Sequence, residues 1–117
     1  MATGYLINSD FQVITEVHVD DLETIQDCVG GYIELAYSLP NGDHIFVNEE
    51  GKLKDPTRFF AIKETGLFHK AHQMFAGNAV FLGREIEDED GDMVSRAEPG
   101  ITLEQLKEAV VFFQLEK

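Results

Sequence analysis

The stretch that decides the fold spans residues 32–48 and reads YIELAYSLPNGDHIFVN. In its first half Ile33, Leu35 and Tyr37 alternate with other side chains, and this period of two is typical of a β-strand. Pro, Asn, Gly and Asp at residues 40–43 favour a tight turn, and a second alternating run follows. The sequence therefore predicts an antiparallel β-hairpin.

Strand-forming and helix-forming segments alternate on either side of this hairpin. A helix is predicted from Asp20 to Gly30, because Asp20 and Glu23 form a capping-box pattern and Gly30 favours a left-handed end. A last helix is predicted from Thr102, with an apolar seam that reaches Phe113. The other predicted elements are strands over residues 5–8, 11–19 and 79–82, a polar hairpin over 85–95 and a short helix over 57–63.

The order of these elements predicts an α+β fold. The chain has 117 residues, which is the length of one domain, so residues 1–117 are expected to form a single α+β domain. We expect a mostly antiparallel or mixed sheet with two to three helices packed on one face. The single cysteine, Cys28, excludes an internal disulfide and falls on the apolar stripe of the first predicted helix.

The charge of the chain is strongly negative and unevenly distributed. Nine Lys and Arg residues against 22 Asp and Glu residues give a formal charge of −13. Residues 1–51 hold ten acids and no Lys or Arg, residues 52–84 hold six cations and two acids, and residues 85–117 hold ten acids and three cations. Such a balance opposes direct binding to nucleic acid or to anionic membranes and favours a basic protein partner.

Three explanations of this acidity remain open: solubility, adaptation to a saline cytoplasm, and a surface that occupies the nucleic-acid groove of another protein. No apolar run approaches the roughly 18 residues of a membrane helix. Residues 1–4 lead into the first strand without a basic segment and an apolar stretch, so a cytoplasmic location is expected.

Catalytic and metal-binding patterns are missing from the sequence. Aligning Gly91 with the sixth position of an EF-hand loop places Ile86 first and Ala97 twelfth, where carboxylates are required. His69 and His72 have no neighbouring residues to complete a zinc site. Neither a nucleophile elbow nor a phosphate-binding glycine loop occurs. We therefore assign no catalytic residue, metal or cofactor, and a non-enzymatic role is favoured.

Two charged regions are candidate binding sites. A partner-binding surface is expected from the acids near the first predicted helix and in the 85–92 loop. The alternative is an anion or nucleotide site in the basic, phenylalanine-rich segment 52–84, unless its rings are core residues and its cations pair with the acids. The acidic candidates are Asp20, Asp21, Glu23, Asp27, Glu85, Glu87, Asp88, Glu89, Asp90 and Asp92, and the anion-binding candidates are Arg58, Lys63, His69 and Lys70.

Three motifs in order resemble the domain of unknown function 3846 family. They are GGYIE at residues 30–34, NEEGKL at 48–53 and GNAV at 77–80, so the likeness covers about residues 22–83. Arg58 stands where members of the family often carry Asn. The resemblance implies a small protein of phages, plasmids or bacterial genomes and supplies no catalytic residue.

These observations together lead to one expectation and two alternatives. We expect a non-enzymatic acidic binding protein, encoded by a phage or plasmid, that inhibits a host defence or nucleic-acid-processing protein. The first alternative is a small enzyme or nucleotide-binding module that uses segment 52–84. The second is a homo-oligomeric structural protein assembled through residues 67–75 and the last helix.

Overall fold

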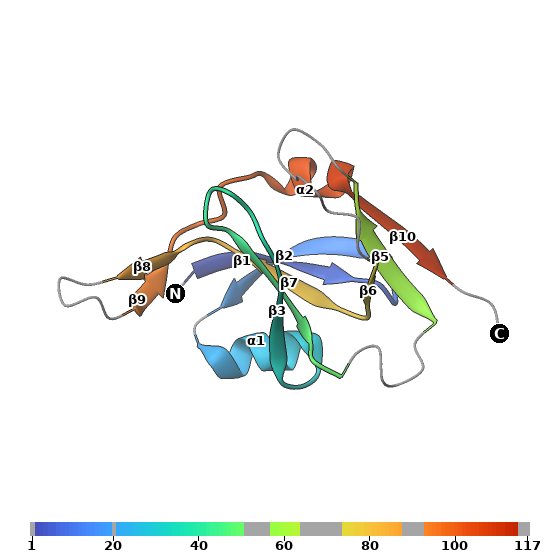
Figure 1. Ribbon diagram of the computed structural model, residues 1–117, viewed down its shortest axis with the longest axis horizontal. Helices are drawn as coiled ribbons and strands as arrows, with labels where there is room; N and C mark the ends of the chain where they lie inside the picture. Colours follow the sequence, from blue (N-terminus) through green and yellow to red (C-terminus); the bar gives the residue numbers. More distant parts are fainter. Residues whose placement is uncertain (1, 20, 51–56, 64–73, 88–92, 115–117) are drawn as a thin grey trace.

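The computed structural model describes residues 2–19, 21–50, 57–63, 74–87 and 93–114. Within these ranges the chain forms ten strands and two short helices (Figure 1). They are β1 (Ala2–Asn8), β2 (Val13–Val19), α1 (Leu22–Val29), β3 (Ile33–Ser38), β4 (His44–Asn48), β5 (Arg58–Ile62), β6 (Met74–Ala76), β7 (Ala79–Leu82), β8 (Glu85–Glu87), β9 (Met93–Arg96), α2 (Leu103–Ala109) and β10 (Val110–Gln114).

A five-stranded antiparallel sheet with the order β2-β1-β7-β4-β3 forms the centre of the fold. The apolar run Ala79–Leu82, predicted as a buried strand, is its middle strand, and all four side chains are 0% exposed. Val80 and Leu82 belong to the core under α1, whereas Ala79 and Phe81 belong to the core on the other face. The strand is therefore covered on both faces.

A second layer covers the face of the sheet opposite α1. It consists of α2 and a three-stranded sheet with the order β10-β5-β6. Phe60 and Leu106 from this layer are fully buried in one cluster with Phe81, and the rings of Phe60 and Phe75 stack 5.1 Å apart. Figure 1 shows α1 and α2 on opposite sides of the five-stranded sheet.

The hairpin predicted over residues 32–48 is confirmed as β3 and β4. The pairing has one irregularity between Leu35 and Tyr37, and the turn includes Gly42 in a left-handed conformation with a φ of +94°. The predicted strands around residues 5–19 are also present, as is the pairing of β8 with β9. The capping box of Thr102 and Gln105 is confirmed.

The predicted α+β class, with two to three helices on one face, is wrong. The described chain is mostly antiparallel sheet in two layers, and its two helices lie on opposite faces. The predicted helix over 57–63 is strand β5, and the last helix ends at Ala109, after which β10 begins. Aromatic and β-branched side chains in both segments suit a sheet, and the two segments pair with each other.

The start of the first helix also differs from the prediction. Asp21, rather than Asp20, is the N-cap, and its carboxylate accepts from Thr24 N at 2.9 Å. Asp20 lies outside the described residues. Gly30 ends the helix as predicted, with a φ of +82°.

Candidate functional site

The end of α1 and the end of β4 are joined at one corner of the five-stranded sheet. Asn48 Nδ2 donates to Val29 O at 3.2 Å, which satisfies a carbonyl at the helix end. Asn48 Oδ1 accepts from Glu50 N at 2.8 Å. A Cβ on Gly31 would lie 2.9 Å from Asn48 Nδ2, so only glycine leaves this amide in place. One side chain thus connects the end of α1, the end of β4 and the turn after β4.

The motifs of the family resemblance meet at this corner. Glu49 N donates to Tyr32 O at 3.0 Å, which extends the pairing of β3 and β4 beyond Asn48. The last pair between β4 and β7 is Val47 with Ala79, so Asn48 and Asn78 follow at the same end of adjacent strands. Segments far apart in the sequence therefore form one structural unit.

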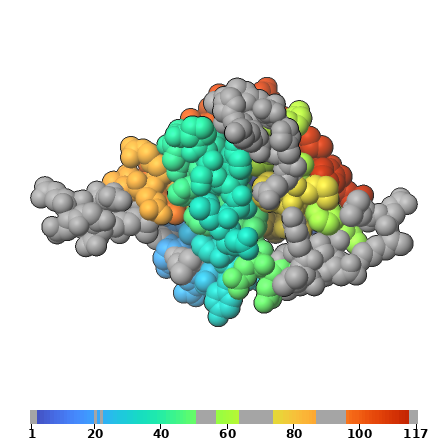
Figure 2. Space-filling view, viewed as in Figure 1, coloured from blue at the N-terminus to red at the C-terminus, as the bar shows by residue number. Residues whose placement is uncertain are grey.

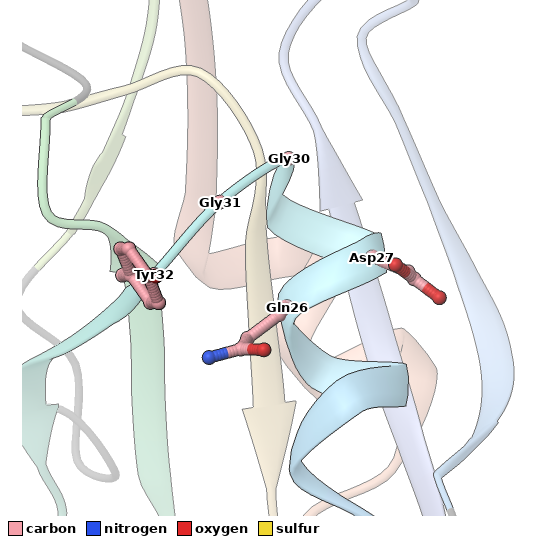
Figure 3. Close-up of a pocket in the computed structure, with 5 residues that line it drawn as sticks. All are labelled: Gln26, Asp27, Gly30, Gly31 and Tyr32. Atoms are coloured by element: carbon pink, nitrogen blue, oxygen red, sulfur yellow. The ribbon is translucent and has the colours of Figure 1, made fainter.

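A hollow of about 440 Å³ opens beside this corner and is lined by Gln26, Asp27, Gly30, Gly31 and Tyr32. In Figure 3 the Gln26 amide points towards Tyr32, whereas Asp27 points to the opposite side of the helix. Tyr32 is 70% exposed. The residues that line the hollow offer a ring, an amide, a carboxylate and backbone groups.

The comparison with protein families agrees with the motifs at this corner. The family model described as Domain of unknown function (DUF3846) matches residues 2–110. The chain belongs to this family. The match extends on both sides of the predicted 22–83 and takes in the β8–β9 hairpin and α2, which carry none of the three motifs. No curated protein and no solved structure matches the chain.

The acidic residues predicted as a partner surface of this DUF3846 protein fall into three groups. Glu23 and Asp27 are exposed on α1 and form no ion pair within the described chain. Asp21 and Glu85 have internal partners. Hydrogen bonds from the backbone and side chain of Thr24 lower the pKa of Asp21. Glu85 Oε1 lies 3.3 Å from Arg96 Nη2. Glu87 ends β8, and Asp20, Asp88, Glu89, Asp90 and Asp92 lie outside the described residues.

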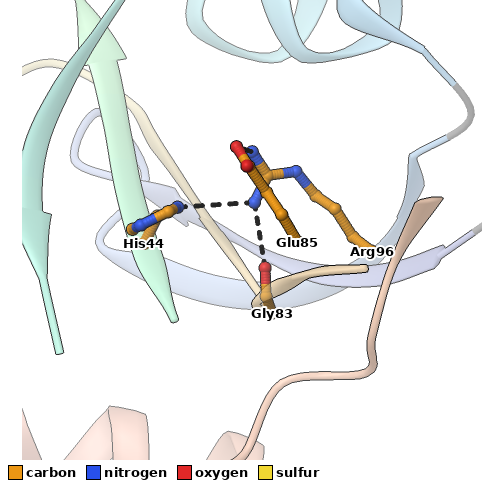
Figure 4. A network of polar contacts seen from close by, with 4 residues as sticks. All are labelled: His44, Gly83, Glu85 and Arg96. Atoms are coloured by element: carbon orange, nitrogen blue, oxygen red, sulfur yellow. Dashed lines mark hydrogen bonds and ion pairs between the residues drawn. The ribbon is translucent and has the colours of Figure 1, made fainter. Parts of the chain in front are cut away.

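Arg96 is a structural residue that the sequence analysis missed. Its Nη1 donates to Gly83 O at 2.9 Å and lies 3.5 Å from His44 Nδ1 (Figure 4). Its guanidinium carbon is 5.1 Å from the centre of the Phe46 ring. Burial lowers the pKa of Arg96, and the charge of Glu85 opposes this shift. The contacts hold the β8–β9 hairpin against β4 and the end of β7. The opposite charges of Glu85 and Arg96 at the base of the predicted hairpin were the available signal.

Most of the phenylalanine rings of the alternative anion site are buried in the core. Phe59, Phe60 and Phe75 are between 0% and 7% exposed, so their faces are not available for stacking on a base. Arg58 begins β5 and Lys63 follows it, and neither forms an ion pair in the part of the chain that the structure describes. His69 and Lys70 lie outside the described residues.

Other features of the described ranges bear on metal, thiol and membrane chemistry. No group of three or more His, Cys, Asp or Glu side chains within these ranges is placed to hold a metal ion. Cys28 is half-buried against the core under α1, as predicted, and burial raises the pKa of its thiol. Neither helix in the described ranges is long and apolar enough to cross a membrane.

Proposed function

We propose that this DUF3846 protein is a non-enzymatic acidic binding protein that recognises a basic protein partner in the cytoplasm. One observation carries the proposal: α1 and the first four strands of the large sheet contain acids and no Lys or Arg, whereas the second layer is nearly balanced in charge. Through residue 50 the described chain contributes α1 and four of the five strands of the large sheet, with nine acids and no Lys or Arg. Eight of these acids are exposed, and Asp43 alone is buried.

The second layer has a different balance. Its described segments 57–63, 74–76 and 101–114 carry Arg58, Lys63 and Lys107 against Glu104 and Glu108, so 3 − 2 gives +1. A surface adapted only to salt or to solubility needs no such separation, because acids on both layers would serve equally well. The separation supports a surface that meets a positively charged partner.

The finer proposal is that the partner is a host defence or nucleic-acid-processing protein and that this chain is its inhibitor, encoded by a phage or plasmid. A groove that binds phosphates is lined with Lys and Arg, and an acidic protein face is complementary to it. The same face repels nucleic acid itself. Glu23 and Asp27 are the described acids of the proposed contact, together with the acids of the 85–92 loop.

A pair of double variants tests this proposal. Glu23→Lys/Asp27→Lys reverses two exposed charges on α1, and Glu98→Lys/Glu108→Lys makes the same change of charge outside α1 and the large sheet. Immobilised wild-type protein is exposed to host lysate at low salt, the partner is eluted with a salt gradient, and its affinity for each variant is measured. The α1 variant should bind at least about tenfold more weakly, with the control close to wild type. Equal affinity of the two variants would contradict a contact through α1.

A third variant assigns the role of the hairpin loop. Reversing Glu87, Asp88, Glu89 and Asp90 together should abolish binding if the loop shares the contact. Unchanged affinity would remove the loop from the proposal. A thermal-shift screen against nucleotides tests the alternative function, since a ligand at 100 times its dissociation constant would stabilise the fold by about 2.7 kcal/mol.

A further inference from the structure

Strand β3 is an outer strand of the large sheet, and its second edge is open as far as the described residues are concerned. It pairs with β4 on one side, and no other described strand pairs with it. Figure 2 shows the β3 region, in turquoise, running down the front of the molecule. Tyr32 is 70% exposed and Leu35 is 50% exposed, although an exposed edge strand is ordinarily protected against pairing by charge or by its shape.

The register identifies which backbone groups face outwards. Glu49 N donates to Tyr32 O, and the register pairs Glu34 with Val47, so the main-chain groups of Tyr32 and Glu34 face β4. In an antiparallel ladder the intervening residues direct their N–H and C=O groups to the other side. Ile33 and Leu35 therefore present two donors and two acceptors along the open edge. The irregularity after Leu35 limits the regular edge to this short stretch.

The two faces of the same edge differ in chemistry. Ile33 packs in the core under α1, so Glu34 lies on the opposite face of β3. Tyr32 precedes the strand and lines the hollow beside Gln26 of α1, and Glu49 is its cross-strand neighbour. All three are exposed, and neither glutamate forms an ion pair among the described residues. An exposed ring and exposed carboxylates near the same strand edge favour Lys or Arg. On the α1 face, exposed Leu35 favours an apolar side chain.

We propose that β3 receives an extended basic segment of the partner protein as a sixth strand of the large sheet. Residues of the segment opposite Tyr32 and Glu34 are Lys or Arg, and those opposite Ile33 and Leu35 are apolar. The hollow beside Tyr32 gives room for one long cationic side chain. The proposal rests on the proposed function, because it takes the partner to be basic, and it specifies how that partner binds.

Charge selects this occupant over a second copy of the chain. Residues 2–50 contain no Lys or Arg, so two β3 edges would bring Glu34 and Glu49 of one copy towards the same acids of the other. Like charges placed opposite one another on paired strands oppose pairing. A basic segment forms the same backbone hydrogen bonds and neutralises both glutamates.

Synthetic peptides test the pairing without altering the protein. The probe is a labelled peptide of about seven residues, the length of an ordinary strand, in which Lys and Val alternate. Its valines would lie opposite Ile33 and Leu35, with their N–H groups directed at β3. N-methylation of the valines removes these donors and keeps the charge, and N-methylation of the lysines is the matched control. Binding is measured by fluorescence anisotropy, and amide exchange at Ile33 and Leu35 is followed by NMR.

We expect the alternating peptide to bind and to slow amide exchange at Ile33 and Leu35. Methylation of the valines should weaken binding about tenfold or more, because at least two hydrogen bonds are lost, and methylation of the lysines should have a smaller effect. Glu34→Lys/Glu49→Lys should also weaken binding, in contrast to Glu98→Lys/Glu108→Lys.

Three results would overturn strand addition at β3. The first is equal binding of both methylated peptides. The second is unchanged amide exchange at Ile33 and Leu35, and the third is dimerisation through this edge, detected by light scattering. If the basic peptides bind without preference and Glu23→Lys/Asp27→Lys still weakens the natural partner, the proposed function stands and only the binding mode fails. If neither a basic peptide nor a basic protein binds, the proposed function fails as well.

Discussion

Replacing Asp43 by alanine should detach the β3–β4 turn from the segment that leads into α2. Asp43 is 2% exposed, and its Oδ2 accepts from Gly100 N at 2.9 Å and from Asn41 Nδ2 at 3.0 Å. Asp43 N donates to Asn41 Oδ1 at 3.0 Å, so the turn is also bound within itself. The alanine side chain removes both acceptor contacts and leaves the main-chain bond in place.

The expected loss follows from these two contacts. A hydrogen bond to a charged acceptor contributes about 1.5 kcal/mol at the lower end of its range, so Asp43→Ala should reduce the free energy of unfolding by about 3 kcal/mol. For a domain of this size the melting temperature should fall by roughly 10 °C. Asp43→Asn keeps an oxygen that can accept from both donors, and it should cost about 1 kcal/mol.

Urea denaturation of wild type, Asp43→Ala and Asp43→Asn measures these differences directly. Equal slopes against urea concentration would show that the three proteins unfold by the same transition. If Asp43→Ala unfolds within about 0.5 kcal/mol of wild type, the range of neutral surface substitutions, the two hydrogen bonds do not hold the turn. If Asp43→Asn is as damaging as the alanine variant, the charge of the carboxylate matters more than its acceptor geometry.

Two further predictions concern the ends of α1. Asn48→Ala should lower the free energy of unfolding by about 1–2 kcal/mol, because Val29 O and Glu50 N lose their hydrogen-bond partner. Amide exchange at the last turn of α1 should become faster, and unchanged exchange there would contradict this role of Asn48. The pKa of Asp21 is lowered by its bonds to Thr24, so its contribution is present above the unfolded value of 3.8 and is lost as the pH falls through the folded pKa. Asp21→Asn keeps a cap and should flatten the acid side of the stability–pH curve, whereas an identical curve would refute the linkage.

The elements that the sequence predicted correctly are those whose signals are local. The 32–48 hairpin follows from alternation and turn residues, the end of α1 from Gly30, and β7 from four consecutive apolar residues. The first turn of α2 follows from its capping box, which involves residues only three apart. Each of these signals is contained in a few neighbouring residues, so no knowledge of the remaining chain was needed.

The elements that were predicted wrongly depend on contacts between residues far apart in the sequence. Segments 57–63 and 110–114 each carry an acceptable helical pattern alone, and their strand conformation comes from pairing Phe60 with Phe112 and Phe59 with Phe113, more than fifty residues apart. That pairing also stacks the rings of Phe59 and Phe113. Short apolar runs are ambiguous between helix and strand, and the partner decides between them.

For the candidate site, the sequence predicted the sign of the surface but not which acids are available to a partner. In the sequence, nothing distinguishes the acids Asp21 and Glu85 from Glu23 and Asp27. In the structure, Asp21 caps α1 and Glu85 forms an ion pair with Arg96. The burial of Arg96 depends on the approach of β9 to β4, which is a tertiary contact. The open edge of β3 depends on the strand order, which no local pattern encodes.

The separation of charge into layers follows from the way the large sheet is assembled. Its fifth strand, β7, comes from the middle of the chain, beyond the cations Arg58 and Lys63, and is inserted between β1 and β4. Because β7 is covered on both faces, it consists of apolar residues and brings no charge into the sheet. Arg58, Lys63 and Lys107 stay with β5 and α2 in the second layer, whereas Arg84 and Arg96 lie beside the β3–β4 hairpin. A basic segment that approaches β3 meets Glu34 and Glu49 at the strand edge, whereas Arg96 is held over the Phe46 ring on the α1 face, away from Glu34.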